Sequence, residues 1–305
     1  MNDIEALEHL KKSDKFRVIE RLNFPERYWQ GVPATARIGL VLDVEATGLD
    51  TLRDKIIELG FVAFEYDALT GLVYRILHNY GGFEDPGKPL TDIIKKITGI
   101  SDDMLAGQRL DDDEINAWLQ KADIVIAHNA AYDRQMLERR LPMACEANWA
   151  CTMFDINWAD EDVSSLKLDY IAYRLGYFFD GHRAVNDAQA TLHLLTKPLP
   201  VSDKKAMVAL LTSARDTSRR FFAEYAPFEK KDVLRERGYR WLPGFCYGEP
   251  GNQKKGVWSR AVGQEQIEDE ERWLGEVVYM QKAARFSYKE ITARERYSLR
   301  EFEAD

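Results

Sequence analysis

Residues 38–44 constrain the fold more than any other segment, because they form an apolar run broken only by Asp43. Such a run is typical of a central strand that is buried on both faces of a sheet. Glu45 follows Asp43 by two residues, so both side chains leave the same face of the strand. Buried carboxylates are costly unless they are paired or bind a metal ion, which makes the pair a candidate metal site. Acidic pairs are also common turn or cap residues at strand ends, so the pair alone does not decide the matter.

The segments that follow predict an α/β fold. Further strands are predicted at 56–66, 71–80, 123–128 and 149–154, and helices at 90–105 with a break at Gly99, 112–121, 131–140, 166–175 and 184–195. Residues 67–71 are predicted to join the second and third strands as a hairpin. Three antiparallel strands followed by alternating helix and strand indicate one mixed sheet flanked by helices.

The chain is predicted to have three parts. Residues 1–36 are expected to be an N-terminal helical extension, with helices near 4–10 and 16–22 and a linker at 31–37. Two prolines within 197–202 predict a boundary, which separates an α/β domain at 37–197 from a C-terminal module at 201–305. In this helical and small α/β module, helices are predicted at 202–224, 230–237, 264–280 and 291–302, and strands at 239–242 and 257–260.

Three more residues of the α/β domain are candidates for chemistry. Asp133 lies in the predicted first turn of helix 131–140, where an acidic residue is also favourable for the helix alone. His182 and Asp187 are five residues apart, so on one helix they would point to different faces. We therefore predict that His182 lies in the loop before helix 184–195 and Asp187 in its early turns. Taken singly, a solvated loop histidine and an exposed helical aspartate explain these two equally well.

The combination of these residues favours a specific chemistry. Four carboxylates suit hard divalent cations, and Asp43, Glu45, Asp133 and Asp187 together are enough for two ions about 3.5–4 Å apart. A histidine has an ordinary pKa near neutrality, so His182 is suited to take a proton from a water molecule. This set predicts metal-dependent cleavage of phosphodiester bonds.

Three sequence motifs resemble those of a known superfamily. Residues 43–49 (DVEATGL), 128–133 (HNAAYD) and 182–187 (HRAVND) resemble the three exonuclease motifs of the DEDDh, or DnaQ-like, superfamily. This group includes the proofreading epsilon subunit of bacterial DNA polymerase III and ribonuclease T. Residues 98–105 resemble a further, non-catalytic marker of the group, and the resemblance covers about 38–196. Residues 210–215, 226–234 and 237–241 resemble the C-terminal extension of a bacterial epsilon-like subgroup, which implies no known role.

The resemblance implies a ribonuclease-H-like fold with sheet order 3-2-1-4-5 and release of mononucleotides in the 3′-to-5′ direction with two Mg²⁺ or Mn²⁺ ions. It implies that Asp43, Glu45, Asp133 and Asp187 are metal ligands and that His182 is the general base. It places Ala46, Thr47, Leu49 and Asn129 at positions that hold the terminal nucleotide. Ala46 stands where threonine is frequent and Tyr132 where phenylalanine is usual, and neither change removes a ligand.

The charge distribution bears on the partner. The net charge is −9, but residues 201–260 carry 13 Lys/Arg against 7 Asp/Glu, interleaved with aromatic residues. Charge and rings together are typical of a track for single strands, although a solvated helix face explains the charge equally well. We expect Phe221, Phe222 and Trp258 to be core residues. The exposed track is predicted to comprise Arg219, Arg220, Lys230, Lys231, Lys254 and Lys255.

These features predict a 3′-5′ exonuclease that acts on free 3′ ends of single-stranded or frayed DNA. The alternatives are a 3′-5′ exoribonuclease and an inactive nucleic-acid-binding scaffold on the same fold. No clamp-binding motif is found, no apolar run approaches the roughly 18 residues of a membrane span, and no secretory signal is found. The three cysteines have no paired spacing, so we predict free thiols in a cytoplasmic protein.

Overall fold

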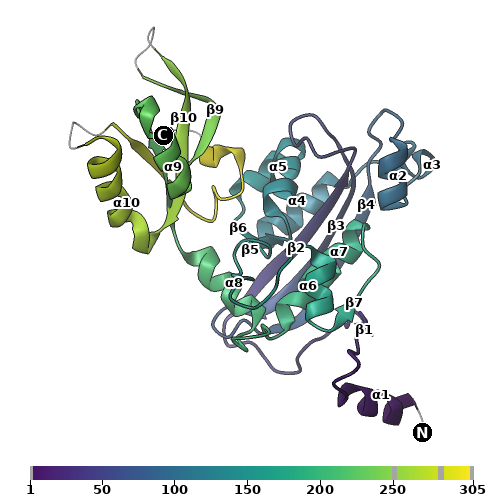
Figure 1. The fold of residues 1–305 in the computed structure, drawn as a ribbon. Coiled ribbons are helices and arrows are strands. Elements are labelled where there is room, and N and C mark those ends of the chain that lie inside the picture. The colour runs from purple at the N-terminus through teal and green to yellow at the C-terminus, as the bar shows by residue number, and fades with distance from the viewer. Residues whose placement is uncertain (1–2, 249–252, 281–284, 303–305) are drawn as a thin grey trace. The chain divides into compact units, whose positions relative to one another are not determined.

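The computed structural model describes residues 3–248, 253–280 and 285–302 (Figure 1). The chain forms two compact units, which divide between Ser213 and Ala214. The domain boundary at 197–201 stays a prediction. Among the described helices, none has both the length and the apolar character that a membrane span requires.

The first unit is built on a mixed five-stranded sheet in the order β4-β3-β2-β5-β6. Its strands are β2 Ala36–Ala46, β3 Ile56–Asp67, β4 Val73–Phe83, β5 Ile124–Ala127 and β6 Trp149–Cys151. β2, β3 and β4 are antiparallel, whereas β5 and β6 run parallel to β2. Leu40, Val41 and Leu42 of the central strand are fully buried, as the apolar run predicts. The predicted ribonuclease-H-like sheet with order 3-2-1-4-5 is confirmed.

Helices cover both faces of this sheet (Figure 1). The helices of this part of the unit are α2 Asp92–Thr98, α3 Asp102–Leu105, α4 Asp112–Lys121, α5 Ala130–Arg140, α6 Leu168–Arg174 and α7 Ala184–Thr196. On one face, Trp118 of α4 stacks on His78, whose ring contacts Phe61 of β3. On the other face, α7 lies against the neighbouring β3 residue Gly60. Gly99 ends α2 in the left-handed conformation (φ 69°), at the predicted break.

The N-terminal segment differs from the prediction in its second half. Helix α1 Asp3–Lys11 is present, but the helix predicted over 16–22 is wrong. β1 Glu20–Arg21 instead pairs in parallel with β7 Tyr177–Phe178. The backbone N–H groups of Glu20 and Leu22 donate to the carbonyls of Gly176 and Phe178, and the stiff β-branched residues before β1 favour extended backbone.

The second unit contains an antiparallel sheet in the order β11-β8-β10-β9. Its elements are β8 Ser218–Ala223, α9 Lys231–Arg237, β9 Arg240–Tyr247, β10 Lys254–Gly263, α10 Ile267–Trp273 and β11 Ser287–Ile291. The helix predicted over 202–224 is wrong, because α8 Ala206–Arg215 ends and β8 follows. Phe221 and Phe222 are both fully buried, and a strand sends them into separate clusters on its two faces, which one helix face would not do.

Two further predictions about this unit are corrected. The helix predicted over 291–302 is reduced to a 3₁₀ turn at Leu299–Phe302, because the chain up to Ile291 pairs with β8. Arg219 and Arg220, predicted to be exposed, are largely buried. Arg219 pairs with Glu271 and Glu290, and Arg220 pairs with Glu301, so neither belongs to an open cationic track.

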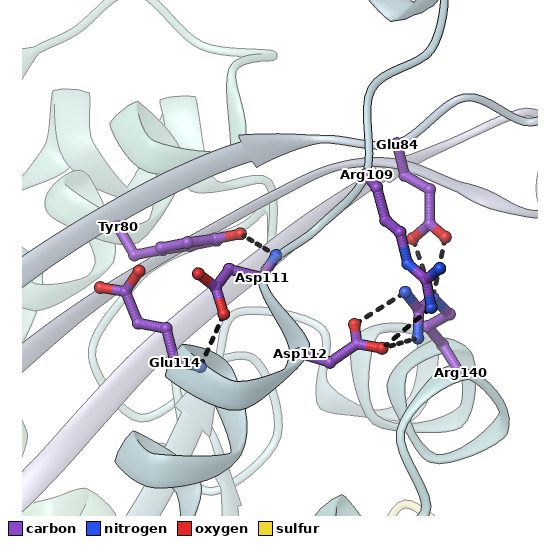
Figure 2. A network of polar contacts seen from close by, with 7 residues as sticks. All are labelled: Tyr80, Glu84, Arg109, Asp111, Asp112, Glu114 and Arg140. Carbon is purple, nitrogen blue, oxygen red and sulfur yellow. Dashed lines mark hydrogen bonds and ion pairs between the residues drawn. The ribbon is translucent and has the colours of Figure 1, made fainter.

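A bridging arginine links the end of α5 to the segment after β4 and to the start of α4 (Figure 2). Arg140 at the end of α5 donates from Nε to both carboxylate oxygens of Glu84, at 3.0 and 2.9 Å. Its Nη1 and Nη2 donate to Asp112 of α4 at 3.1 and 2.8 Å. Arg109 also approaches Asp112, at 3.8 Å, but its side chain is 78% exposed against 23% for Arg140.

We predict that Arg140→Met lowers the free energy of unfolding by about 1–3 kcal/mol, because Glu84 and Asp112 then face each other without their shared donor. For a unit of this size each kcal/mol lowers the melting temperature by about 2–4 °C. Arg109→Met is the matched control and should change stability by less than about 0.5 kcal/mol. Thermal melts that give equal shifts for both variants would contradict the bridging role.

Candidate active site

Three carboxylates from two distant segments converge at the end of β2. Asp43 and Glu45 leave the same face of the strand, and Asp187 comes from the first turn of α7. Each offers one carboxylate oxygen, and these oxygens all lie within 4.8 Å of one another. Asp187 lies more than a hundred residues after β2 in the sequence, so it is the fold that brings the three carboxylates together.

Asp133 comes from a third segment and is bonded to the strand that carries Asp43 and Glu45. It lies in the first turn of α5, as predicted, and is buried. Its Oδ1 accepts a hydrogen bond of 3.0 Å from the backbone N–H of Val44, the residue between Asp43 and Glu45. Asp133 is not one of the three whose oxygens lie within 4.8 Å, but it is fixed to the strand that carries two of them.

The position of Asp187 depends on a close contact between α7 and β3. Gly60 of β3 is the cross-strand partner of Asp43. A Cβ atom at Gly60 would lie 2.2 Å from the backbone nitrogen of Val185 and 2.4 Å from the carbonyl carbon of Ala184. The absence of a side chain at this position therefore lets the start of α7 lie directly on the sheet beside Asp43.

An ion pair between a buried glutamate and a partly exposed arginine, not predicted from the sequence, holds the same helix end. Glu58 of β3 is almost fully buried and accepts from Arg183 Nε at 3.1 Å and Nη2 at 2.9 Å. The backbone N–H of Ala184 donates to the other Glu58 oxygen at 3.2 Å. Glu58 is the cross-strand partner of Glu45. A glutamate within the apolar strand 56–64 was a signal that could have identified it.

His182 lies in the loop immediately before α7, as predicted, and is exposed. Its φ of 63° is in the left-handed region, which residues other than glycine seldom occupy. Two hydrogen bonds hold the loop: Arg183 N–H donates to Asp187 Oδ2 at 3.1 Å, and Asn186 Nδ2 donates to the Asp180 carbonyl at 2.9 Å. Within the described residues the His182 ring has no hydrogen-bond partner, so it is available to a ligand.

Burial, with a smaller contribution from the neighbouring negative charges, raises the pKa values of the carboxylates. Burial, and then the charges of Asp187 and Glu58, raise the pKa of Glu45 to about 8. Burial raises the pKa of Asp133 to about 7, although the Val44 N–H opposes the rise. Burial also raises the pKa of Asp187 to about 6, and burial with the neighbouring carboxylates raises the pKa of Asp43 well above its usual range. An all-oxygen, electron-rich cluster of this kind fits hard divalent cations such as Mg²⁺ and Mn²⁺.

The four residues predicted to hold the terminal nucleotide lie in different surroundings. Leu49 is 90% exposed and Asn129 is exposed at the cap of α5, whereas Ala46 is buried. The Thr47 hydroxyl donates to Asp54 at 2.7 Å and accepts from the Lys55 N–H at 3.1 Å, which fixes the turn that carries Leu49. The Tyr132 hydroxyl donates to the Gly48 carbonyl at 2.7 Å, so this tyrosine ties α5 to the same turn.

The comparison with known families gives the class of the protein. The family model described as exonuclease, RNase_T, matches residues 40–195. The chain belongs to this exonuclease family, a family of divalent-metal-dependent nucleases, and the predicted DnaQ-like relationship is confirmed.

Among individual relatives, the DNA polymerase III PolC-type proteins of Caldanaerobacter subterraneus subsp. tengcongensis and Halalkalibacterium halodurans are 29% and 31% identical to the chain. These matches cover 52% and 51% of this chain but only 11% of each relative, so the chain spans a small part of their length. Exonuclease X in complex with 5′ overhanging duplex DNA is 21% identical, over 56% of this chain and 89% of that chain, with a TM-score of 0.37. E. coli Exonuclease I in complex with a dA16 oligonucleotide is 13% identical, over 74% and 63%, with a TM-score of 0.46.

The raised pKa values predict how the metal-free protein responds to pH. Glu45 and Asp133 bind protons more tightly in the folded state than in the unfolded chain, so their contribution to stability is lost as pH rises through about 7–8. The buried His128 has the opposite effect on stability, because its pKa is lowered to about 4 in the folded state. This effect is confined to pH values below about 6.5, since above that pH the histidine is neutral in both the folded and the unfolded state. In chelator, the melting temperature should therefore fall between about pH 6.5 and 8.5.

Saturating Mg²⁺ should abolish this fall, because bound cations stabilise the ionised carboxylates. Glu45→Gln should reduce the fall in chelator, since it removes one of the groups that titrate in this window. Thermal melts in which the metal-free protein becomes more stable over this pH range would contradict the raised pKa values of the carboxylates.

Two neighbouring glycines provide a matched test of the contact between α7 and β3. Gly60 and Gly81 are cross-strand partners, but a Cβ at Gly81 would lie 3.7 Å from the nearest atom, which is ordinary contact. We predict that Gly60→Ala displaces Asp187 and reduces activity by about 10²-fold, the cost of a misplacement near 1 Å. Gly81→Ala should retain activity within a few-fold. Equal nuclease rates and Mn²⁺ affinities for the two variants would show that α7 is positioned by other contacts.

Proposed function

We propose that this protein is a 3′-5′ exonuclease that removes nucleoside 5′-monophosphates from free 3′ ends of single-stranded or frayed DNA. The observation that carries the proposal is the convergence of Asp43, Glu45 and Asp187 within 4.8 Å, with Asp133 fixed beside them and His182 exposed at the edge. Family membership supports the same reaction. The choice of DNA rests on the relatives, which are DNA polymerases by name.

In the proposed mechanism, Asp43, Glu45, Asp187 and Asp133 would hold two Mg²⁺ or Mn²⁺ ions. When bound, such ions would neutralise charge at the phosphate and lower the pKa of the attacking water. His182 takes the proton of that water as general base, and its place outside the carboxylate cluster lets it reach solvent. Leu49 presents an apolar surface to the terminal base, while Thr47 and Asp54 hold the turn that positions it. Asn129 and Ala46 complete the edge of this nucleotide site.

Matched linear and circular oligonucleotides test the direction and the substrate. With Mg²⁺, linear single-stranded DNA labelled at its 5′ end should shorten stepwise from the 3′ end, and excess chelator should stop the reaction. Closed circles and strands with blocked 3′ ends should resist. Cleavage of circles would make the protein an endonuclease.

The same assay with RNA of matched sequence separates the alternatives. Faster degradation of RNA than of DNA would establish the exoribonuclease, since the two differ at the 2′-hydroxyl. Binding of both strands without hydrolysis of either would establish the inactive scaffold.

His182→Ala tests the proton transfer. A positioned base contributes about 10²–10⁴-fold, so the single-turnover rate should fall by this factor while oligonucleotide binding persists. His9→Ala, an exposed histidine on α1, is the control and should match the unaltered protein. A His182→Ala variant with the full rate would place the base elsewhere.

A further inference from the structure

The second unit contains a pocket whose walls are mainly aromatic. It has a volume of about 300 Å³ and is lined by Ala223, Ala226, Phe228, Lys231, Trp241, Tyr247 and Trp258. This volume is at the lower end of the range for small-ligand sites. We call it the aromatic pocket. All of its residues belong to the second unit, and no part of the catalytic reaction proposed above uses them.

Trp241 is an exposed ring held in a fixed position. It is 49% exposed, and its ring meets that of Trp258 edge-on, at 5.6 Å between centroids and 65° between planes. Beneath it lies Gly256, which has a φ of +86° at an irregularity between Lys255 and Val257 of β10. A Cβ at Gly256 would lie 2.2 Å from the Trp241 ring, so this glycine makes room for the indole. The side chain therefore presents a preorganised planar surface.

The other walls are also fixed or exposed rings. The Tyr247 hydroxyl accepts from the backbone N–H of Tyr225 at 3.2 Å, and the two rings pack edge-on at 4.9 Å. Phe228 is 76% exposed. Exposed aromatic surface on an otherwise packed unit favours a ligand with a flat apolar face, because such a ligand removes the rings from water.

The charge around the pocket indicates what kind of flat ligand fits. Lys231 lies over the Phe228 ring at 4.4 Å, and Lys254 is the cross-strand partner of Tyr247. Within the part of the chain that the structure describes, no carboxylate forms an ion pair with Lys231, Lys254 or Lys255. The more buried arginines of the unit differ, since Arg219, Arg220, Arg237 and Arg260 are all paired with acidic side chains. Of these three lysines, Lys231 lines the pocket and Lys254 is the cross-strand partner of the wall residue Tyr247, while Lys255 follows Lys254 on β10.

A flat apolar face joined to negative charge is the chemistry of an unstacked nucleotide. We propose that the aromatic pocket binds a nucleobase of single-stranded nucleic acid, with Trp241 as the stacking surface and Lys231, Lys254 and Lys255 as contacts to the flanking phosphates. The proposal rests on the proposed function, which supplies such a strand. The pocket is then a non-catalytic binding site for the substrate strand. Duplex bases do not enter it, because they are already stacked.

The test measures the binding of a fluorescein-labelled oligothymidylate by anisotropy, with the full chain in excess chelator so that no hydrolysis occurs. Trp241→Ala should raise Kd about 5- to 150-fold, the effect of losing one base–aromatic stack. Trp241→Phe should restore most of the affinity, which excludes misfolding as the cause. Charge reversal of Lys254 and Lys255 together should reduce the slope of log Kd against log salt by about 1.4 or more. The same reversal of Lys12 and Lys15, exposed residues of the first unit, is the matched control.

A second substrate separates this proposal from the proposed function. The p-nitrophenyl ester of thymidine 5′-monophosphate needs only the catalytic site, and its turnover should be equal in the unaltered protein and in Trp241→Ala. Oligothymidylate binding that is unchanged by both Trp241→Ala and Phe228→Ala would overturn the nucleobase site and leave the pocket for a protein segment. Failure of the unaltered protein to hydrolyse the ester in Mg²⁺ would overturn the proposed function instead, whereas the binding measurement in chelator would still decide the pocket.

Discussion

The contact between the start of α7 and strand β3 is the constraint on which the site depends. Asp187 lies beside the carboxylates of β2 because Gly60 has no side chain and because Glu58 binds Arg183 and the Ala184 N–H. Both residues of β3 lie directly opposite the two site residues of β2, since Gly60 pairs with Asp43 and Glu58 with Glu45. The antiparallel register of β2 and β3 therefore positions the start of α7 and the carboxylates of β2 together.

This arrangement places four carboxylates at a buried site, where their ionisation does not stabilise the metal-free protein. The raised pKa values of Asp43, Glu45, Asp133 and Asp187 all have burial as their first cause. The nearby cation Arg183 lowers the pKa of Glu45 only in part, because its guanidinium is paired with Glu58. Such a cluster is stable only when packing elsewhere compensates, or when cations bind it. We therefore expect the four carboxylates to be fully ionised near neutral pH only when divalent cations are bound to them.

The sequence predicted the first unit well because its signals are local. The apolar run before Asp43, the break at Gly99 and the helix 112–121 each depend on neighbouring residues, and each is present in the structure. The five candidate residues also lie on the predicted elements. The roles of Glu58 and Gly60 were not predictable in this way, because they arise from contacts with residues more than a hundred positions away.

The second unit shows the opposite case. Residues 202–224 have an apolar content compatible with one helix, but pairing of β8 with β10 and β11 competes for the backbone, and the adjacent Phe221 and Phe222 need two faces. Arg219 and Arg220 could not be recognised as buried, because their partners Glu271 and Glu301 lie far along the chain. Propensity is a weak guide where such tertiary contacts decide the structure.

The most direct test is an anomalous-diffraction map of the protein crystallised with Mn²⁺ and thymidine 5′-monophosphate. The proposed site predicts two manganese peaks coordinated by Asp43, Glu45, Asp187 and Asp133, with the nucleotide phosphate between them and His182 facing that phosphate. Manganese peaks elsewhere with none at these carboxylates, in a crystal where the nucleotide is bound, would contradict the two-metal exonuclease site.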